Sequence, residues 1–489
     1  MKVRFSALFT VVIIILGFAW QTPAQAQKFS VLYNFGGKSG DPEEPAPPGI
    51  ISQERDGNLY STTYSGGSVR DGTVFKITPT GKLRVLYNFD NTQGVDPSSG
   101  LTLATNGKLY GTASLGGTSS RGTLFEITQS GTLTTLYNFT GGNDGGIPTG
   151  PPIQGTDGNL YGAMSGFGKF SCGTVYKVTH SGKLITLYEF DGTHGCSPAS
   201  PLILGSDGNF YGITVAGGKT DEGVIFKITP TGHYSVIHTL VRRTGSGSAL
   251  ILGSDGNFYG ATEGGGYLGY GTIFKVTPAG ELTILHDFTE TEGYGPPAGL
   301  LQATDGNFYG TRGGAANSYG TIYRITPQGH FTVLYYFDDT TGAFPLGNLI
   351  QHTSGILYGE TELGGTAGYG VFFKLDIGLK PFVSFVSAAG NVGKTVEILG
   401  QGLKGTKAVS FNGTAATFKV ISDTYLTAIV PKGATTGFVT VTAPGGKLKS
   451  NKRFRVILAL IAAPCVRCSG GKRTPGQRRS VVRKGGKFT

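Results

Sequence analysis

The pattern of apolar and polar positions repeats along most of the chain. Within Gly100–Phe139, glycine-containing turns separate four short runs rich in Leu, Thr, Tyr and Phe. These runs are Leu101–Ala104, Lys108–Ala113, Thr123–Thr128 and Thr132–Phe139. They are too short for helices, and Asn106-Gly107 and Ser130-Gly131 are typical of tight hairpin turns. The unit therefore predicts a four-stranded antiparallel meander.

Seven copies of this unit can be aligned on the glycine of its first turn. The turn glycines, 48 to 51 residues apart, are Gly57, Gly107, Gly158, Gly208, Gly256, Gly306 and Gly355. Four strands in a period of this size predict the blade of a β-propeller. A single sheet of this kind cannot bury both of its apolar faces, so we expect the copies to stack on one another.

The seventh copy lacks a fourth strand, since no matching run follows Gly370–Asp376. The missing run stands at the other end of the repeats, because Phe29–Phe35 matches the fourth strand of the other copies. We therefore predict that residues 29–35 complete the seventh blade and leave no free edge. The predicted fold of residues 27–378 is an all-β, seven-bladed β-propeller closed by the N-terminal strand.

A different β pattern occupies residues 379–456. Its short apolar runs are Phe382–Val386, Thr395–Gly400, Ala408–Gly413, Ala416–Ser422, Tyr425–Pro431, Gly437–Ala443 and Phe454–Val456. About seven short strands in this length predict a small immunoglobulin-like β-sandwich. The segment contains no cysteine and no tryptophan, so it is not an antibody-type domain.

The two ends of the chain differ from its body. Residues 1–26 have a basic start, an apolar run Ala7–Trp20 and small residues at Ala24 and Ala26, which predict a secretory signal peptide cleaved after Ala26. An uncleaved membrane anchor is the weaker alternative, because the run is shorter than the ~20 residues that a spanning helix needs. Residues 457–489 are basic and predicted to be disordered, with surface attachment as a candidate role. The mature protein is expected outside the cytoplasm: extracellular, at the cell surface or periplasmic.

The net charge of +11 comes mostly from these ends. Two cations lie in residues 1–26 and eight lie after Val456, which leaves +1 for residues 27–456. A nearly neutral body does not favour a nucleic-acid partner.

The recurrent Asp-Gly-Asn turns, such as the one at Asp157, raise the question of calcium. Each aspartate stands alone and lacks the clustered oxygen ligands of a calcium site, so its expected role is in the turn. The seven histidines have no metal-binding spacing, and the chain has no Gly-x-Ser-x-Gly motif. We therefore assign no catalytic residue, metal or cofactor from the sequence.

Variation is concentrated at one end of the predicted blades. The residue before the third strand reads Asp71, Arg121, Cys172, Glu222, Tyr270, Tyr319 and Tyr369 in the seven copies. Because variable loops on a rigid scaffold commonly carry binding function, we place the ligand on this face. The candidate binding residues are Tyr270, Tyr319, Tyr369, Arg121 and Glu222. The alternative for the tyrosines is that they pack between adjacent blades.

Cys172 and Cys196 both fall at this end of the third copy. In an exported protein a disulfide between them is expected, with two unlinked thiols as the alternative.

The blade pattern resembles the GloVer (Gloeo/Verruco-type) tandem repeat of exported bacterial proteins over residues 29–376. Copies such as Asp56–Phe89 and Asp305–Phe337 keep nearly all of its parts. Residues 380–456 resemble an IPT/TIG domain, with the motifs GKTVEILGQGLKG and GFVTVTAPGGK in the expected order. The resemblance implies an exported propeller followed by a sandwich, and it brings no catalytic residues.

Three functions remain open at this point. The preferred one is an exported, non-catalytic binding or scaffold protein that recognises a polysaccharide, cell-wall or protein ligand through the variable face. The alternative is a secreted propeller hydrolase or lyase acting on glycans, for which a pair of carboxylates would serve as general acid and base. Its candidate carboxylates are Asp71, Glu222, Glu263, Glu290 and Glu292. The third is a purely structural component of the cell envelope.

Overall fold

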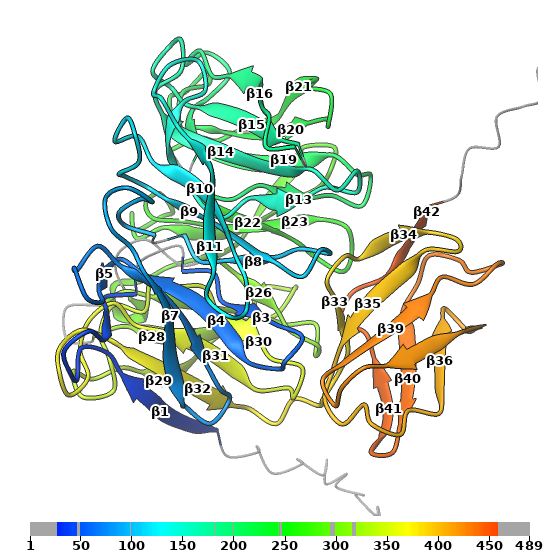
Figure 1. Ribbon diagram of the computed structural model, residues 1–489. Helices are drawn as coiled ribbons and strands as arrows, with labels where there is room; N and C mark the ends of the chain where they lie inside the picture. The colour runs from blue at the N-terminus through cyan, green and yellow to red at the C-terminus, as the bar shows by residue number, and fades with distance from the viewer. Residues whose placement is uncertain are drawn as a thin grey trace, which may run out of the picture. The chain divides into compact units, whose positions relative to one another are not determined.

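The computed structural model describes residues 27–45, 49–97, 99–179, 181–198, 200–242, 244, 247–293, 299–314 and 319–457 (Figure 1). Within these residues the chain is built from β-strands, and its one helical element is the three-residue 3-10 helix η1 (Glu290–Glu292). The predicted signal peptide, residues 1–26, lies outside the described residues. So does the predicted tail, apart from Ile457, which ends the last strand.

The repeat region contains, in its described residues, seven antiparallel sheets of four or five strands, numbered here in chain order. The first sheet has β3 (Ser52–Gln53), β4 (Leu59–Thr63), β6 (Thr73–Ile77) and β7 (Leu83–Asn88). The second has β8 (Thr102–Leu103), β9 (Leu109–Ala113), β10 (Thr123–Ile127) and β11 (Leu133–Asn138). The third has β12 (Gly146–Pro148), β13 (Ile153–Gln154), β14 (Leu160–Gly166), β15 (Thr174–Val178) and β16 (Leu184–Glu189). The fourth has β17 (Cys196–Pro198), β18 (Ile203–Leu204), β19 (Phe210–Ala216), β20 (Val224–Ile228) and β21 (Tyr234–Thr239).

The remaining sheets follow the same plan. The fifth has β22 (Gly247–Leu252), β23 (Phe258–Thr262), β24 (Thr272–Val276) and β25 (Leu282–Asp287). The sixth has β26 (Leu301–Gln302), β27 (Phe308–Arg312), β28 (Thr321–Ile325) and β29 (Phe331–Tyr336). The seventh has β30 (Ile350–Gln351), β31 (Leu357–Glu360), β32 (Val371–Asp376) and β1 (Lys28–Asn34). A short ribbon of β2 (Pro42–Glu43) and β5 (Ser65–Gly66) adjoins the first sheet.

Strand β1 pairs antiparallel with β32, as the sequence predicts for the missing fourth strand. The pairing also reproduces a detail of the other sheets. Every third-to-fourth strand pair in the first six sheets has a register shift at the same place, such as Leu124/Phe125 in the second sheet, and β1 has one at Val31/Tyr33. Because a β-bulge at a fixed position is a feature of the repeat, its presence marks β1 as a displaced copy of the fourth strand.

The cores lie between the sheets. Seven clusters of buried apolar side chains each join one sheet to the next in chain order, and one of them joins the seventh sheet to the first. In that last cluster Tyr358 and Phe372 of the seventh sheet pack with Leu59 and Phe75 of the first. Both faces of each sheet are therefore covered by neighbours, which is what a strand pattern apolar on both sides requires.

The C-terminal segment forms two packed sheets. One has the order β33 (Ser384–Phe385), β35 (Thr395–Leu399), β39 (Tyr425–Ile429) and β38 (Phe418–Val420). The other has the order β37 (Thr414–Ala416), β36 (Ala408–Phe411), β40 (Val439–Ala443) and β41 (Gly446–Lys449). A parallel pair of β34 (Ala389–Asn391) and β42 (Arg455–Ile457) completes the segment. Side chains such as Ile398, Val441 and Phe454 fill the core between the sheets.

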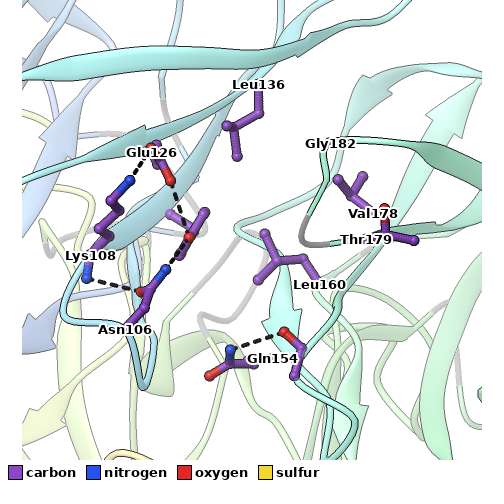
Figure 2. A pocket seen from close by; sticks show the side chains of 11 residues that line it. Asn106, Lys108, Glu126, Leu136, Gln154, Leu160, Val178, Thr179 and Gly182 are labelled. Atoms are coloured by element: carbon purple, nitrogen blue, oxygen red, sulfur yellow. Dashed lines mark hydrogen bonds and ion pairs between the residues drawn. The ribbon is translucent and has the colours of Figure 1, made fainter.

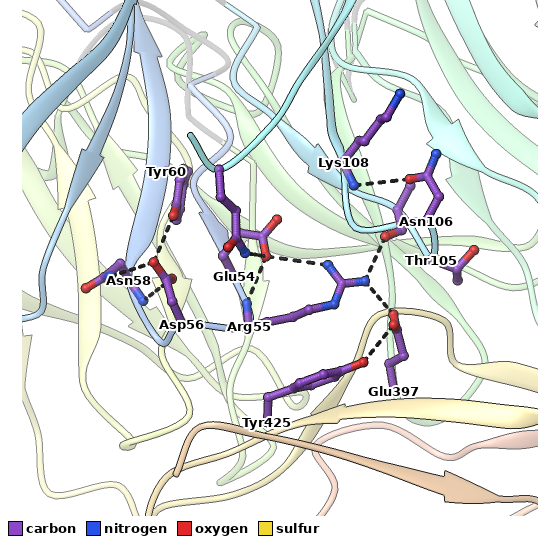
Figure 3. A network of polar contacts seen from close by, with 12 residues as sticks. Glu54, Arg55, Asp56, Asn58, Tyr60, Thr105, Asn106, Lys108, Glu397 and Tyr425 are labelled. Carbon is purple, nitrogen blue, oxygen red and sulfur yellow. Dashed lines mark hydrogen bonds and ion pairs between the residues drawn. The ribbon is translucent and has the colours of Figure 1, made fainter. Parts of the chain in front are cut away.

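Arg55 links the first two sheets to the sandwich through a polar network (Figure 3). Its Nη2 lies 2.7 Å from Glu397 Oε2 and donates to the carbonyl oxygen of Ala104 at 3.2 Å. Tyr425 donates to the other oxygen of Glu397 at 2.8 Å, and Thr424 Oγ1 donates to the carbonyl oxygen of Arg55 at 2.6 Å. The only two carboxylates of residues 380–456 are Glu397 and Asp423, so one of them is used in this contact.

Removal of residues 27–36 tests the role of β1. Phe29 stacks on Tyr335 with ring centroids 3.9 Å apart, and Phe35 is fully buried. Their loss should lower the free energy of unfolding by at least about 5 kcal/mol, since each large buried aromatic contributes roughly 3–5 kcal/mol, and should expose β32 as a free edge. Thermal and urea denaturation measure the change, and removal of residues 480–489 is the matched control. Equal melting temperatures for the two truncated chains would contradict this role.

Candidate functional site: the loop face

Each sheet has two ends with different chemistry. At one end the first strand turns into the second through the Asp-Gly-Asn turn; we call this the turn face. At the other end the second strand leads into the third and the fourth strand leads into the next sheet; we call this the loop face. The variable residues singled out in the sequence lie on the loop face.

On the turn face the aspartates are held by protein partners. In the third sheet Asp157 Oδ2 accepts from Tyr161 OH at 2.7 Å, from Lys177 Nζ at 3.0 Å and from Asn159 Nδ2 at 2.6 Å. Burial acts to raise the pKa of Asp157, but the hydrogen bonds from Tyr161, Asn159 and Lys177 lower it to about 2. The same arrangement recurs as Asp56–Tyr60–Lys76 and Asp207–Tyr211–Lys227. Among the described residues no group of three or more His, Cys, Asp or Glu is placed to hold a metal ion.

The second sheet keeps this triad with its charges exchanged. Asn106 replaces the aspartate, Lys108 replaces the following asparagine, and Glu126 replaces the lysine of the third strand. Lys108 pairs with Glu126, and Tyr110 OH lies 2.7 Å from Asn106 Nδ2 and 3.2 Å from Glu126 Oε2. This exchange can be read from the sequence when the seven copies are compared position by position.

A cavity of about 220 Å³ adjoins this exchanged triad, between the second and third sheets (Figure 2). Its polar side is formed by Asn106, Lys108, Glu126 and Gln154, and its apolar side includes Leu160. Gln154 is itself engaged, because its Oε1 accepts from the backbone nitrogen of Thr105 at 3.0 Å. The polar groups around the cavity are therefore largely paired with one another.

The loop face concentrates unusual backbone conformations. All of the non-glycine residues with positive φ that the structure describes between 27 and 379 lie on it: Glu44, Arg70, Asp96, Ser120, Ile147, Phe167, Ser171, Ser197, Asp221 and Phe344. For Ile147 and Phe344, with φ of 58° and 52°, this conformation is sterically costly. Strain of this kind is found disproportionately at functional sites.

Hydrogen bonds between sheets fix these strained positions. The backbone nitrogen of Phe344 donates to the carbonyl oxygen of Tyr319 at 2.8 Å, and that of Glu44 donates to the carbonyl oxygen of Tyr369 at 3.0 Å. Equivalent bonds run from Ile147 to Arg121 and from Ser197 to Cys172. Four of the variable residues before the third strands are thus anchored through their backbones, which leaves their side chains able to differ from sheet to sheet.

The three candidate tyrosines do not share one environment. Tyr319 is 45% exposed, whereas Tyr270 and Tyr369 are half-buried and pack against the clusters between sheets. Tyr270 and Tyr369 therefore make the contacts expected if these tyrosines pack between adjacent sheets. The ligand role of Tyr319 stays a prediction.

The other predicted residues lie on different sheets of the same face. Arg121 is exposed and its guanidinium lies 4.2 Å from the centroid of the Phe167 ring. Glu222 precedes β20 in the sequence and is half-buried. Cys172 and Cys196 form a disulfide, which confirms the predicted bridge and ties the loop before β15 to β17. The five candidate binding residues occupy equivalent positions of five sheets.

Carboxylates gather in two neighbouring pairs that the sequence pattern did not bring together. Burial and then the charge of Asp71 raise the pKa of Asp96, and burial and then the charge of Glu44 raise the pKa of Glu362. Tyr64, 45% exposed, lies near both pairs, because the charge of Asp96, then burial and then Glu44 raise the pKa of its hydroxyl. Only Asp71 of these carboxylates was a sequence candidate; Glu44, Asp96 and Glu362 were not singled out from the sequence.

Glu292, another candidate carboxylate, bonds to neighbouring protein groups. Glu292 Oε2 accepts from the backbone nitrogen of Thr289 at 2.8 Å and lies 2.9 Å from His286 Nε2. Burial acts to raise the pKa of Glu292, but the hydrogen bonds from His286 and Thr289 lower it. This side chain secures the turn after the fifth sheet.

Exposed apolar side chains also favour the loop face. Of the eighteen large apolar side chains exposed in the described residues, twelve lie there: Tyr64, Val69, Leu115, Ile147, Phe170, Val215, Val241, Tyr267, Leu268, Tyr319, Phe344 and Leu363. Three others lie on outer strands and three on the sandwich. The turn face has none among the described residues, so apolar exposure separates the two faces.

The sequence matches the models of two known families. The Gloeobacter/Verrucomicrobia repeat matches residues 16–154, 46–249 and 202–418, and the IPT/TIG domain matches residues 381–456. The chain belongs to the Gloeobacter/Verrucomicrobia repeat family. The tandem repeats and the C-terminal IPT/TIG domain expected from the motifs are confirmed by these matches.

Several solved structures are similar to this repeat protein at low identity. A fungal alcohol oxidase in complex with copper is 15% identical, with 85% of this chain and 98% of that chain covered and a TM-score of 0.46. A gluconolactonase from Xanthomonas campestris is 13% identical, with 69% and 98% covered and a TM-score of 0.39. The extracellular domain of a hybrid two-component system from B. thetaiotaomicron is 12% identical, with 88% and 57% covered and a TM-score of 0.46. No curated protein matches the chain.

Glu360 is a buried carboxylate at a repeat position that has threonine in the second and sixth copies. Thr112 and Thr311 donate to carbonyl oxygens of the next sheet, Gly150 and Gly347, but the seventh sheet has Glu360 at this position. Ser61 of the first sheet lies 3.4 Å from Glu360 Oε2, and Oε1 has no hydrogen-bond partner. Burial, weakly opposed by Ser61, raises the pKa of Glu360 to about 8.

Glu360→Thr should therefore change how stability depends on pH. Between pH ~5 and ~8 the folded state keeps the Glu360 proton that the unfolded state releases, so the native chain loses stability as pH rises. For a pKa raised from 4.5 to about 8, the loss is on the order of 5 kcal/mol at pH 8. Urea denaturation at several pH values should show a flatter profile for the variant. Exposed Glu281→Thr is the control, and parallel profiles for wild type and Glu360→Thr would contradict the assignment.

The exchanged triad of the second sheet gives a second prediction. Glu126→Lys should lower the free energy of unfolding by about 1 kcal/mol, because it leaves Lys108 beside a like charge with no carboxylate partner. Adding Asn106→Asp and Lys108→Asn rebuilds the arrangement of the third sheet and should recover most of the loss. Urea denaturation of the three proteins measures this, and a triple variant no more stable than the single one would count against the coupling.

Proposed function

We propose that this protein is an exported, non-catalytic binding protein built as a closed, seven-bladed β-propeller. In this proposal residues 1–26 are a signal peptide, 27–378 the propeller, 379–456 the IPT/TIG sandwich and 457–489 a basic tail. Closure is supported by the pairing of β1 with β32 and by the buried cluster that joins the seventh sheet to the first. Each of the seven sheets would then be one blade with its full set of strands.

The loop face is the ligand-recognition surface in this proposal. The observation that carries it is the concentration of twelve exposed large apolar side chains on this face, above a backbone held by bonds between sheets. A ligand from the polysaccharide, cell-wall or protein classes fits such a surface. An uncharged polysaccharide fits best, because aromatic rings such as Tyr64 and Tyr319 can stack on sugar rings while neighbouring carboxylates accept hydrogen bonds from sugar hydroxyls.

Export is supported by the disulfide between Cys172 and Cys196 on the same face. Disulfides persist mainly in oxidising compartments outside the cytoplasm, and this one braces two loop-face segments. Within the described residues no helix is long and apolar enough to cross a membrane.

A glycan hydrolase or lyase is the second candidate, and the paired carboxylates favour it. Asp96 has a raised pKa beside Asp71, and two carboxylates in unlike environments are the usual general acid and base of glycoside cleavage. If this candidate is correct, Asp96→Asn should abolish product release without weakening binding of the substrate.

The binding proposal is tested with the purified chain against a panel of uncharged polysaccharides, cell-wall fragments and proteins. Tyr64→Ala combined with Tyr319→Ala should weaken binding roughly five- to hundredfold, since each lost aromatic contact contributes roughly 0.5–1.5 kcal/mol. Ile185→Ala is the control, because Ile185 is 38% exposed on the outer strand β16 and pairs with Lys177, toward the turn face.

Binding and released products are measured in the same samples. Saturable binding that depends on Tyr64 and Tyr319 but not on Ile185, without products, supports the binding function. Products that disappear with Asp96→Asn support the enzyme instead. Equal losses in the double variant and in Ile185→Ala would remove the loop face as the site.

A further inference from the structure

The near-neutral charge of residues 27–456 conceals a strong separation of charge. Residues 27–379 contain twenty lysines and arginines against twenty-eight carboxylates, a net charge of −8. Residues 380–456 contain eleven lysines and arginines against two carboxylates, a net charge of +9 in 77 residues. The sandwich is therefore strongly basic, and the net charge of +1 over residues 27–456 hides this.

One face of the sandwich collects part of this charge on a flat surface. In the sheet β37–β36–β40–β41 the strand β40 buries Val439, Val441 and Ala443, so Thr440 and Thr442 point to the outside. Their partners on β41 are Lys449 and Lys447, which are exposed. The two lysines thus stand beside a row of threonine hydroxyls at the edge of the sheet.

Small side chains extend this surface across the sheet. On β36, Ser410 pairs with Thr440 and Ala408 pairs with Thr442, and Ala415 of β37 pairs with Ser410. Residues paired in this way point to the same side of a sheet, so Ala408, Ser410 and Ala415 share the outer face with the threonines. The result is a shallow platform of hydroxyl and methyl groups with cations along one side.

An aromatic ring adjoins the cations. Phe438 precedes β40 and lies on the outer side, with Lys449 Nζ 3.9 Å and Arg453 Cζ 6.0 Å from its ring centroid. The ring holds both cationic groups near the platform without neutralising them, because a cation–π contact leaves the charge in place.

Carboxylates lie elsewhere on the sandwich. Glu397 belongs to the opposite sheet and is bound to Arg55 and Tyr425. Asp423 lies in a loop, where it accepts from the backbone nitrogen of Lys404 at 3.2 Å. The cations of the platform therefore have neither carboxylate of residues 380–456 as a partner, and their charge is available to a ligand.

We propose that the outer face of the sheet β37–β36–β40–β41 binds an anionic polysaccharide. Lys447, Lys449 and Arg453 bind the carboxylate, sulfate or phosphate groups of the sugar chain, Thr440 and Thr442 bond to its hydroxyls, and Phe438 packs against a sugar ring. The choice of a glycan over a nucleic acid rests on the exported location in the proposed function. The site itself is separate from the loop face.

The test measures binding of the full chain to heparin and polygalacturonate, with dextran as the uncharged probe and duplex DNA as the alternative polyanion. Lys447→Gln, Lys449→Gln and Arg453→Gln together should weaken heparin binding about tenfold at low salt, since each exposed ionic contact contributes up to ~1 kcal/mol. Lys394→Gln, Lys404→Gln and Lys419→Gln remove the same charge from other parts of the sandwich and form the matched control. They should change the affinity less than about twofold.

The outcomes separate this site from the loop face. A loss confined to the platform variant, unaffected by Tyr64→Ala and Tyr319→Ala, supports the proposal even if no loop-face ligand is found. Equal losses of heparin affinity in the platform variant and in the control variant would show that only total charge matters. That result would overturn the proposal. Tighter binding of duplex DNA than of both anionic polysaccharides at equal salt would also overturn it.

Discussion

Apolar packing between consecutive sheets is the interaction on which the rest of this structure depends. A four-stranded meander with both faces apolar has no stable isolated state in water, because one sheet cannot cover itself. Each cluster therefore takes its side chains from two sheets, as when Phe139 of the second sheet packs near Tyr176 of the third. Once every sheet is fixed by its neighbours, loops can vary at one end without loss of the scaffold. This is why variable residues and strained backbone occur on the same face.

The sequence was sufficient for much of this architecture because the repeat supplies an internal comparison. Strand β1 could be assigned to the seventh sheet from its similarity to other fourth strands, although about 340 residues separate it from β32. The bridge between Cys172 and Cys196 followed from their shared place in one copy. Both predictions depended on local pattern, and the assignment of β1 also used the rule that a sheet edge needs a partner.

Burial and pairing across sheets were harder to predict. Tyr270, Tyr319 and Tyr369 are identical in type and repeat position, but only Tyr319 is exposed, whereas the other two pack against the clusters between sheets. The proximity of Asp71 to Asp96 joins two repeat positions that the sequence keeps 25 residues apart. Charge was misjudged for a different reason: a net sum over residues 27–456 cancels an acidic repeat region against a basic sandwich.

The central claim is that ligands are recognised by the loop face. Hydrogen–deuterium exchange on the chain with and without a bound uncharged polysaccharide tests it most directly, because it reports on both faces in one measurement. The account predicts slower exchange in the loops 64–72, 114–122 and 339–346, with unchanged exchange at turns such as Asp157–Asn159. Slower exchange at the turns and the adjoining cavity, with the loops unaffected, would contradict it.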